Sequence, residues 1–464
     1  MKPSQLLSAA EARLTALPNA SEMTSRHRRP TLVVGLLLFL GICGWLLSGD
    51  VVFGRSTVIA TRPEFDRSID LSAPDAPFIA WPLARVCSET SWFPGLVFVC
   101  DNNSGGIGNI RNYILTCLRY GIDAGATGFL LPRIESRSEK NLSHLFRGSK
   151  PFDYFFDEQH FRKAMKTSCP QITIYDDKAS IPHSPSEKIP HTQKITPNSF
   201  GIRGGCDERD LNRHTDAFSA RLRNHMITTV ETLQQRAISP SNPRLVRFDW
   251  GVQWDWPVYK DGPEFTNTFG GLLRFRKDIL VLGKAVTAAM LRFAAQHGQR
   301  GRFMGIHLRT EHDVLPQWPA FDRQTEVYLH EASRAGFSAA YLATGNATEA
   351  SKFASKAATP SRLHLATKHQ LLQSRPEELK QLKALSWDQQ GLVDFVVLLY
   401  SDYFVGVSPS SFSINIAGKR HLRDEGMYTR PWKVGRDGDG RSYLVGYYEE
   451  YWESWIFMYD SLWP

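Results

Sequence analysis

The chain has 464 residues and a formal net charge of +8. Its basic residues are spread along the sequence and form no single block, so the charge gives no reason to expect a nucleic-acid partner and suits an anionic small substrate equally well. No Cys-x-x-Cys pair is present, which argues against a structural zinc site. About 400 residues follow the N-terminal region, enough for two domains.

The N-terminal region predicts a membrane anchor at residues 31–49. Its uncharged apolar run, Thr31–Ser48, is close to the roughly 17 to 25 residues that span a bilayer. The basic cluster Arg26–Arg29 predicts that residues 1–30 are a cytoplasmic tail and that the rest of the chain is lumenal. A cleaved signal peptide is the alternative, but about 30 hydrophilic residues precede the apolar run. We therefore expect a single-pass type II protein of the Golgi or endoplasmic reticulum membrane.

A lumenal location also fits the glycosylation acceptor triplets that begin at Asn102, Asn141 and Asn346. Five cysteines follow the apolar run, and four of them could pair in an oxidising compartment. Cys87 with Cys100 and Cys169 with Cys206 are the pairs nearest in sequence. Cys117 would then be free, because it lies in a helical, apolar pattern. Connectivity itself does not follow from the sequence.

The first half of the chain has the pattern of a parallel sheet. After a proline-containing stem at 50–85, a strand at 95–100 runs into a glycine-rich loop and a helix, and the next strand follows at 126–131. This strand–helix–strand order is typical of parallel pairing. Further elements are expected as helix 209–236, strand 245–248 and helix 272–297. For the tryptophans after that strand, core packing and a sugar or peptide groove stay open: Trp250, Trp254 and Trp256.

The second half alternates in the same way and predicts a second doubly wound unit. Strands are expected at 303–308, 338–343, 362–366 and 403–407. Helices are expected near 324–335, 347–357, 377–384, 389–400 and 409–422. We place the two domains at 86–285 and 286–445. The aromatic tail at 446–464 should pack on the body, because an exposed patch of that size would be sticky.

The strongest functional signal is the end of the strand that begins the second unit. The apolar run Phe303–Ile306 stops at a polar cluster of His307, Arg309, Glu311 and Asp313. Ligands of open α/β sheets bind beyond the carboxyl ends of the strands. An arginine fixed there can give a phosphate two parallel hydrogen bonds. The alternative is a structural ion pair between the arginine and one of the two carboxylates.

The glycine-rich loop Gly105–Asn109 gives a second signal. It would let the backbone approach a ligand closely, and the helix N-terminus beyond it favours anions. It matches neither the dinucleotide fingerprint nor a Walker loop, and a tight turn for helix–sheet packing is the alternative. Arg111 would stand in the first helical turn, where its charge opposes the helix dipole. That placement indicates an anionic partner or a local carboxylate.

The third signal follows the strand at 403–407. A cluster of hydroxyls around Ser410 and Ser411 precedes a helix that starts near Phe412, and free N–H groups there could cradle an anion. Ordinary N-capping is the alternative. Asp437-Gly438-Asp439 has the Asp-x-Asp pattern of metal-dependent nucleotide-sugar transferases, but its glycine-rich setting favours a simple turn.

These three motifs, in this order, resemble the GDP-fucose protein O-fucosyltransferase superfamily, most closely its fungal, membrane-anchored members. The similarity spans roughly residues 95 to 425, and the Gly-Ile-His-Leu-Arg motif that ends at Arg309 is its most specific part. The resemblance implies an α/β fold of the GT-B kind, in which two Rossmann-like domains face a cleft. It also implies inverting, metal-independent transfer of fucose from GDP-fucose to a hydroxyl of a protein or glycan, with no cofactor. The C-terminal domain would hold the nucleotide sugar and the N-terminal domain the acceptor.

By the same resemblance, Arg309 would bind the β-phosphate and stabilise the leaving diphosphate, with His307 shaping the site. The other residues assigned to the donor are Gly106, Gly108, Asn109, Arg111, Ser410, Ser411 and Phe412, with Asp394 and Asp402 as guanine or ribose contacts.

One departure concerns the catalytic base. Some family members carry a glutamate in the glycine loop, whereas this chain has Gly105, Gly106 and Ile107. The base then lies elsewhere, with Glu311 and Asp313 as candidates, or the acceptor is deprotonated without one. Two alternative functions follow: a metal-dependent transferase that uses the Asp-x-Asp motif, and a non-catalytic, membrane-anchored lectin or interaction protein on the same fold.

Overall fold

The computed structural model describes residues 69–183, 192–196, 200, 217–232, 236–249, 254, 256–358, 362–423, 434–435, 439–446 and 461–464. Phe65–Pro464 form one compact unit. Among the described residues, no helix has the length and apolar character needed to cross a membrane. The expected cytoplasmic tail, anchor and early stem, residues 1–68, lie outside the described residues.

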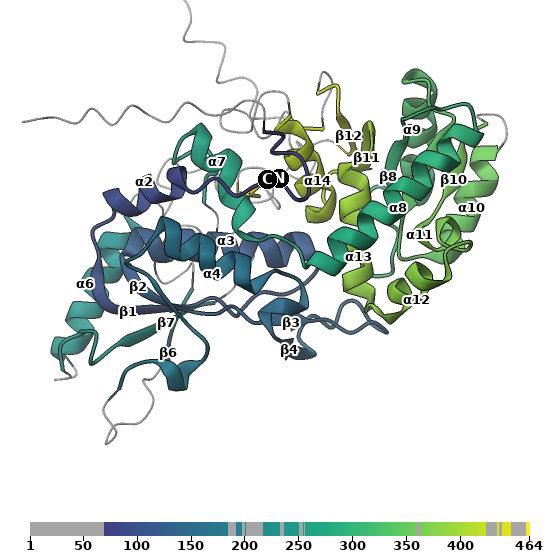
Figure 1. Cartoon of the computed structure of the whole chain (residues 1–464). Helices are drawn as coiled ribbons and strands as arrows, with labels where there is room; N and C mark the ends of the chain where they lie inside the picture. The colour runs from purple at the N-terminus through teal and green to yellow at the C-terminus, as the bar shows by residue number, and fades with distance from the viewer. Residues whose placement is uncertain are drawn as a thin grey trace, which may run out of the picture. The chain divides into compact units, whose positions relative to one another are not determined.

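The first half of the described chain builds a five-stranded sheet of order β5-β2-β1-β7-β6, in which every neighbouring pair is parallel (Figure 1). Its strands are β1 (Phe93–Val99), β2 (Ala126–Leu130), β5 (Thr173–Tyr175), β6 (Thr192–Ile195) and β7 (Arg244–Phe248). The central strand β1 is buried over its last five residues, because a sheet covered by helices on both faces needs apolar side chains on both sides. A small antiparallel hairpin, β3 (Ile134–Ser136) with β4 (Gly148–Lys150), follows β2.

The second half builds another parallel sheet, of order β10-β9-β8-β11-β12. Its strands are β8 (Met304–His307), β9 (Ala339–Ala343), β10 (His364–Ala366), β11 (Tyr403–Val407) and β12 (Ser442–Val445). The chain adds strands outward on one side of β8 and then returns to the other side with β11. The point between β8 and β11 is therefore a topological switch point, where ligands of such sheets bind.

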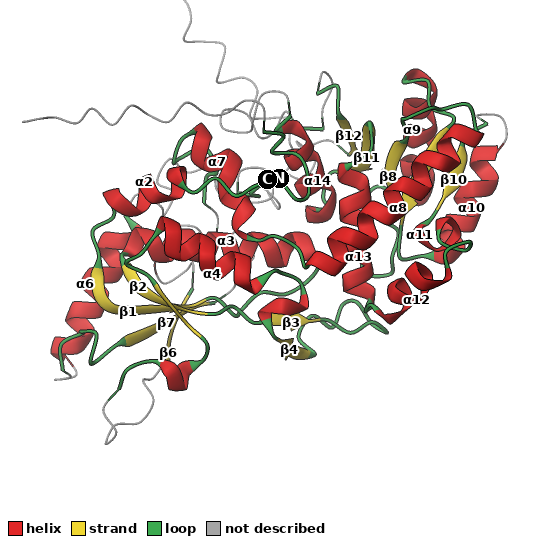
Figure 2. Cartoon of the chain, viewed as in Figure 1, coloured by secondary structure: helices red, strands yellow, loops and turns green. Residues whose placement is uncertain are grey.

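Helices pack on both sheets (Figure 2). Those of the first half are α2 (Trp81–Glu89), α3 (Ile107–Ala124), α4 (Glu158–Ser168), α6 (Phe218–Thr232), α7 (Pro263–Phe269) and α8 (Lys277–Gln296). Those of the second half are α9 (Phe321–Arg334), α10 (Ala347–Ala358), α11 (Lys368–Leu371), α12 (Pro376–Ala384), α13 (Trp387–Leu399) and α14 (Ser411–His421). The boundary expected at 285/286 falls inside α8, which packs against α13 of the second half.

The predicted α/β class with parallel sheets is confirmed, and the expected strands and helices are present with ends shifted by a few residues. For the helix expected at 209–236, the structure describes α6, and residues 209–216 and 233–235 lie outside the described residues. The sequence did not reveal β5, β6 or β12. Each of these strands has only three or four residues and lies at or next to a sheet edge, so it is too short to show an alternating pattern.

The expected disulfides were wrong. The structure pairs Cys87 with Cys169 and Cys100 with Cys117, with Cα–Cα distances of 5.6 and 5.8 Å. Helix α2 packs against α4, which brings Cys87 to the C-terminal end of α4. Helix α3 packs on β1, which brings Cys117 to the residue that follows the strand. Tertiary packing thus decided both pairs, while Cys206 lies outside the described residues.

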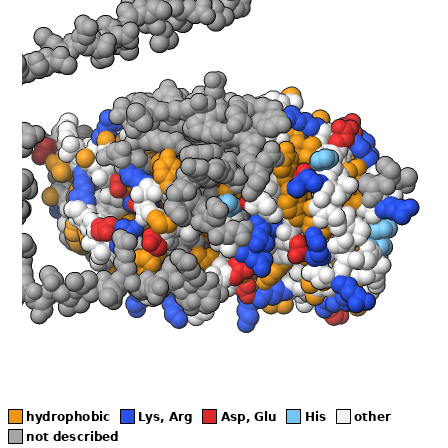
Figure 3. Space-filling model, turned by 90° about the horizontal axis from the view of Figure 1, so that it is seen from above, with side chains coloured by type: hydrophobic (Ala, Val, Ile, Leu, Met, Phe, Trp, Pro, Cys, Tyr) orange, Lys and Arg blue, Asp and Glu red, His pale blue; other side chains and the backbone are white. Residues whose placement is uncertain are grey.

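The tryptophans after β7 belong to the core. Trp254 and Trp256 are fully buried, and both pack against Tyr120 of α3 with ring centroids 5.3 and 5.0 Å away. Trp250 lies outside the described residues. In the aromatic tail, Trp463 is buried against Phe269, and residues 447–460 lie outside the described residues. On the face shown in Figure 3, basic side chains are interspersed with acidic and hydrophobic ones.

Candidate functional site

A cavity of about 640 Å³ lies at the carboxyl ends of β8, β9 and β10. It is lined from both halves of the chain, by the loop before α3 and by the segments that open α10, α13 and α14. The first N–H groups of a helix have no partner inside the helix, and they carry partial positive charge. Several such helix starts around one cavity make it suited to an anionic ligand.

Most of the residues assigned from the sequence meet in this cavity. It is lined by Gly106, Asn109, His307, Arg309, Glu311, Asp313, Asp394, Ser410, Ser411 and Phe412. Three assigned residues do not line it, namely Gly108, Arg111 and Asp402. The lining that the sequence analysis missed includes Arg137, Lys368, Trp387 and Asp388.

Arg309 lies two residues beyond the end of β8 and is held by two carboxylates. Its Nη1 is 2.6 Å from Glu311 Oε2, and its Nη2 is 2.8 Å from Asp313 Oδ1. Burial lowers the pKa of Arg309, but the two adjacent carboxylates outweigh burial and raise it overall. The ion pair considered as an alternative therefore exists, and the guanidinium nevertheless lines an open cavity. Its backbone N–H donates to Gln324 Oε1 at 3.0 Å, which fixes the position of the residue.

Glu311 holds Arg309 in place. Its Oε2 accepts from Arg309, while its Oε1 accepts from the N–H of Gly345 at 2.7 Å. Burial raises the pKa of Glu311, but the Arg309 charge and the Gly345 hydrogen bond outweigh it, so the pKa is lowered overall. The carboxylate therefore stays ionised, and its oxygens are occupied.

His307, the last residue of β8, is neutral at neutral pH because burial lowers its pKa to about 4. Its Nδ1 is 2.7 Å from Ser413 Oγ, and that hydroxyl already accepts from the N–H of Val407. The ring packs against Phe412, with centroids 4.6 Å apart.

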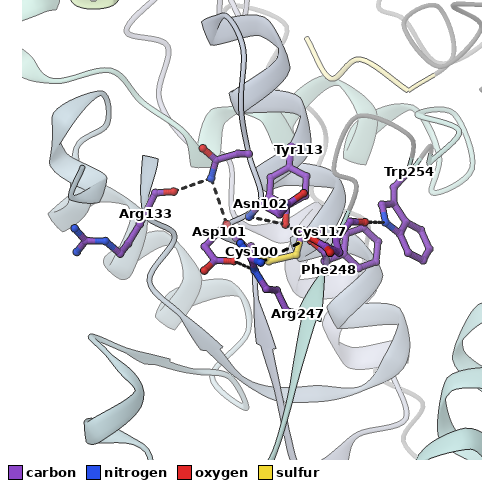
Figure 4. Close-up of a disulfide and its surroundings, with 11 residues drawn as sticks. Cys100, Asp101, Asn102, Tyr113, Cys117, Arg133, Arg247, Phe248 and Trp254 are labelled. Atoms are coloured by element: carbon purple, nitrogen blue, oxygen red, sulfur yellow. Dashed lines mark hydrogen bonds and ion pairs between the residues drawn. A yellow bond between two sulfur atoms is a disulfide. The ribbon is translucent and has the colours of Figure 1, made fainter. Parts of the chain in front are cut away.

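The glycine-rich loop is anchored at its start (Figure 4). The Cys100–Cys117 disulfide ties the end of β1 to α3, and Asp101 pairs with Arg247 of β7 at 2.6 Å. The N–H of Asn102 donates to the hydroxyl of Tyr113 at 3.1 Å. These contacts fix the chain just before it turns into α3.

The turn itself needs glycine at two positions for different reasons. Gly105 has a φ of +89°, a conformation that other residues adopt only with strain. At Gly108 a Cβ atom would lie 2.6 Å from the backbone carbon of Ser411, so glycine is required for the close approach of α3 to α14. The assignment of Gly108 to the donor is therefore corrected, since its position serves packing between the two helices.

Helix α14 offers unused capping groups. Ser410 occupies its N-cap position, yet the Ser410 hydroxyl makes no capping hydrogen bond. The capping alternative therefore does not account for Ser410. Its hydroxyl, Ser411 and the first N–H groups of α14 lie at the cavity.

A second polar cluster occupies another part of the lining. Asp394 of α13 is buried and accepts from Lys368 Nζ at 2.7 Å and from the Tyr341 hydroxyl at 2.5 Å. Arg137, one residue beyond β3, contributes a second guanidinium to the cavity. No sequence pattern indicated a role for Arg137, because this residue lies in an irregular segment outside the three motifs.

Arg111 is a structural residue, contrary to expectation. Its guanidinium is buried and donates to Asn415 Oδ1 and to backbone oxygens of Gly270, Trp463 and the terminal residue Pro464, at 2.5 to 3.0 Å. Burial lowers its pKa to about 10. The positive charge of Arg111 is thus compensated by oxygen atoms from segments that are distant in sequence, and a bound ligand is not needed.

Asp402 lies at the opposite end of the sheet from the cavity. It directly precedes β11, and its Oδ2 accepts from the N–H of Phe303 at 2.9 Å, which ties the amino ends of β8 and β11 together. The expected nucleotide contact is therefore corrected to a strand-end link.

The Asp-x-Asp motif is only partly described. Asp437 lies outside the described residues, whereas the side chain of Asp439 is fully buried and is bound by His421 Nδ1 at 2.9 Å and by the N–H of Gly435 at 2.7 Å. Among the described residues, no group of three or more His, Cys, Asp or Glu side chains is placed to hold a metal ion. The side chains that meet at the cavity include three cations, Arg137, Arg309 and Lys368, which could bind a phosphate, and four carboxylates that pair with them.

Comparison with known structures finds several fucosyltransferases. POFUT1 in complex with GDP aligns at 13% identity with a TM-score of 0.44, covering 77% of this chain and 100% of that one. A FUT1 mutant from Arabidopsis thaliana, also with GDP, aligns at 12% identity and a TM-score of 0.36, covering 73% of this chain and 71% of that one. NodZ from Bradyrhizobium aligns at 15% identity and a TM-score of 0.33, covering 71% of this chain and 92% of that one. No curated protein matches the sequence.

A family model gives the decisive comparison. The model described as GDP-fucose protein O-fucosyltransferase matches residues 96–423, which include the glycine-rich loop, the end of β8 and the start of α14. The match extends over more than half of the chain and contains every described residue that lines the cavity. The chain therefore belongs to the GDP-fucose protein O-fucosyltransferase family, and by that membership it is a glycosyltransferase.

Proposed function

We propose that the protein transfers fucose from GDP-fucose to a hydroxyl of a protein or glycan acceptor, with inversion and without a metal ion. The observation that carries the proposal is Arg309, which is fixed beyond β8 and faces a cavity where α3 and α14 begin. The family match supports the donor. The two disulfides support an oxidising compartment, in agreement with the proposed lumenal orientation in the Golgi or endoplasmic reticulum.

The proposed arrangement is of the GT-B kind, with one Rossmann-like half around each sheet. The second half would hold the nucleotide, because its switch point between β8 and β11 opens into the cavity. The first half would hold the acceptor and contribute the start of α3. A single displacement by the acceptor hydroxyl inverts the anomeric carbon, and it requires the acceptor and the diphosphate on opposite sides of the sugar.

Departure of GDP builds negative charge on the diphosphate. Arg309 can bind the β-phosphate, and the N–H groups at the start of α14 together with the Ser410 hydroxyl can bind the remaining oxygens. Groups fixed before the reaction stabilise such charge without reorganising, which is the task that a metal ion performs elsewhere. Glu311 would keep the guanidinium oriented for this role.

Two features suit the nucleoside. The Asp394 carboxylate, held by Lys368 and Tyr341, can accept from the N–H groups that guanine presents. His307 and Phe412 pack against each other in the same cavity and offer an aromatic surface. We therefore assign Asp394 to binding of the guanine ring and retain Phe412 and His307 as contacts to the donor.

The environments of the cavity carboxylates narrow the choice of the catalytic general base. Glu311 is a poor base, because its oxygens are occupied and its pKa is lowered. Asp388, at the start of α13, has a pKa raised by burial, which the Arg137 charge only partly offsets. A carboxylate with a raised pKa accepts a proton more readily, so Asp388 joins Asp313 as a candidate for general base.

The proposal is tested with the full chain, GDP-fucose and the variants Arg309→Lys and Arg309→Ala. Release of GDP and fucose is measured with water as acceptor, and GDP affinity is measured by calorimetry. We expect turnover to fall about 10²- to 10³-fold in both variants, with no effect of EDTA on the wild type. Arg302→Lys is the matched control, since Arg302 is exposed and packs on Phe337 away from the cavity.

Three results would decide against the proposal. If both Arg309 variants turned over GDP-fucose at the wild-type rate, Arg309 would have no role in catalysis. Loss of wild-type activity with EDTA would favour a metal-dependent transferase. Binding of GDP-fucose without any release of GDP would favour a non-catalytic lectin. Thermal unfolding of each variant shows whether a lost activity reflects lost folding.

A further inference from the structure

Arg137 brings a second guanidinium from the first half of the chain to the cavity. Its Nε is 3.0 Å from Asp388 Oδ1, its Nη1 is 3.6 Å from Asp313 Oδ2, and its guanidinium carbon lies 4.5 Å from the ring centre of Trp387. The side chain is only 9% exposed, although it lines the cavity. Its position is therefore well defined, and a ligand can reach it.

Asp313 is shared between the two arginines of the cavity. Its Oδ1 faces Arg309 Nη2 at 2.8 Å, and its Oδ2 faces Arg137 Nη1 at 3.6 Å. One oxyanion thus bridges two guanidiniums that come from different halves of the chain. A phosphate group has the same kind of oxygens and would bridge the same pair.

The start of α3 adds a second reason to expect an anion here. A Cβ atom on Gly106 would lie 3.8 Å from Arg137 Nη2, so the guanidinium lies beside the N-terminus of α3. A cation next to the positive end of a helix is unfavourable unless an anion lies nearby. Asp388 supplies an anion at Arg137 Nε, 3.0 Å away, whereas the longer distance of 3.6 Å from Nη1 to Asp313 leaves the outer nitrogens less tightly paired.

The charges of the cavity also disfavour simultaneous occupation by Asp313 and a diphosphate. The lining holds three cationic side chains, Arg137, Arg309 and Lys368, against four carboxylates, Glu311, Asp313, Asp388 and Asp394. With all of them ionised, the lining carries one excess negative charge. A diphosphate would add further negative charge, so its binding is favoured if a carboxylate leaves the arginines.

We propose that Arg137 is a second phosphate-binding arginine of the donor site, and that Asp313 is an internal anion that occupies the space between Arg137 and Arg309 until the donor displaces it. This inference rests on the proposed function, because it assumes a nucleoside diphosphate as ligand. The competing interpretation is that Arg137 only links the two halves of the chain through Asp388 and Trp387.

The test compares GDP with guanosine, since the two ligands differ only in the diphosphate. Affinities of the full chain are measured by calorimetry for wild type, Arg137→Ala, Arg137→Lys and Asp313→Asn. We expect Arg137→Ala to weaken GDP binding about 10- to 100-fold and to leave guanosine binding unchanged. Arg137→Lys keeps the positive charge and should lose less GDP affinity than Arg137→Ala. Asp313→Asn removes the competing anion and should tighten GDP binding several-fold.

Arg133→Ala is the matched control. Arg133 lies in the same segment, is exposed and donates to Ser149 rather than lining the cavity, so its loss should not change GDP affinity. Unchanged GDP binding in Arg137→Ala, or equal losses for GDP and guanosine, would overturn the role of Arg137. Weaker or unchanged GDP binding in Asp313→Asn would overturn the displacement, and a fall in turnover with unchanged GDP binding would identify Asp313 as a base instead.

The outcomes also separate this inference from the proposed function. If the wild type binds no GDP, both fail together. If the wild type binds GDP and hydrolyses GDP-fucose while the Arg137 and Asp313 variants bind GDP as the wild type does, only the inference fails.

Discussion

The contact between Gly108 and Ser411 predicts that a single methyl group will disturb both stability and donor binding. In Gly108→Ala the new Cβ would lie 2.6 Å from the backbone carbon of Ser411 and 2.7 Å from its carbonyl oxygen, whereas ordinary contacts are 3.4–4 Å. The obstacle is backbone, so α3 and α14 must separate by roughly 1 Å. Overpacking of this kind costs about 1 to 3 kcal/mol, and the better helix propensity of alanine returns at most about 1 kcal/mol.

The net expectation for Gly108→Ala is a loss of about 1 to 2 kcal/mol in the free energy of unfolding, together with weaker GDP binding, because Ser411 moves with α14. Denaturant titration measures the first and calorimetry the second. Gly391→Ala is the control for stability: Gly391 is in α13, and a Cβ there meets nothing within 4 Å, so the free energy of unfolding should rise by about 0.5 to 1 kcal/mol. Equal stability of the two variants would refute the reasoning.

Two further predictions concern stability. Because burial lowers the pKa of His307 from 6.5 to about 4, the unfolded chain binds a proton in that interval that the folded chain does not, so stability falls as the pH drops from 6.5 to about 4. This site should account for a loss of about 3 kcal/mol in the free energy of unfolding, and His307→Asn should remove that loss. An identical pH dependence of unfolding in wild type and variant would contradict this prediction. Replacing Cys100 and Cys117 by serine should lower the free energy of unfolding by about 3 kcal/mol, as measured by denaturant titration. Replacing Cys87 and Cys169, which are farther apart in sequence, should lower it by about 4.5 kcal/mol. The reverse order would show that loop length does not control these losses.

The sequence predicted those parts of the fold that depend on local pattern. The central strands β1, β8 and β11 are apolar runs, and each is followed by a helix, so their parallel pairing followed from the order of elements. The carboxyl ends of β8 and β11 then brought His307, Arg309 and Ser410 to one cavity. The short strands near the sheet edges had no such pattern.

The errors arose where partners come from distant parts of the chain. Arg111 was expected to face a ligand, but Gly270, Asn415 and Pro464 surround it, and nothing in the local sequence indicates that they meet there. Arg137 was missed for the same reason, since its partners in the second half are far away in sequence. Spacing and composition describe neighbours along the chain, whereas these roles are set by neighbours in space.

The oxygen ring around Arg111 has a consequence for work with separately produced halves. A fragment that ends near residue 285 would retain Gly270 but lose Asn415 and the 461–464 segment, so a buried guanidinium would keep only one of its four acceptors. Loss of these segments would also uncover the side of α3 that packs on them, and this helix follows directly on the glycine-rich loop. Protein engineers who wish to exchange acceptor or donor specificity between relatives should therefore transplant residues within the intact chain instead of recombining halves.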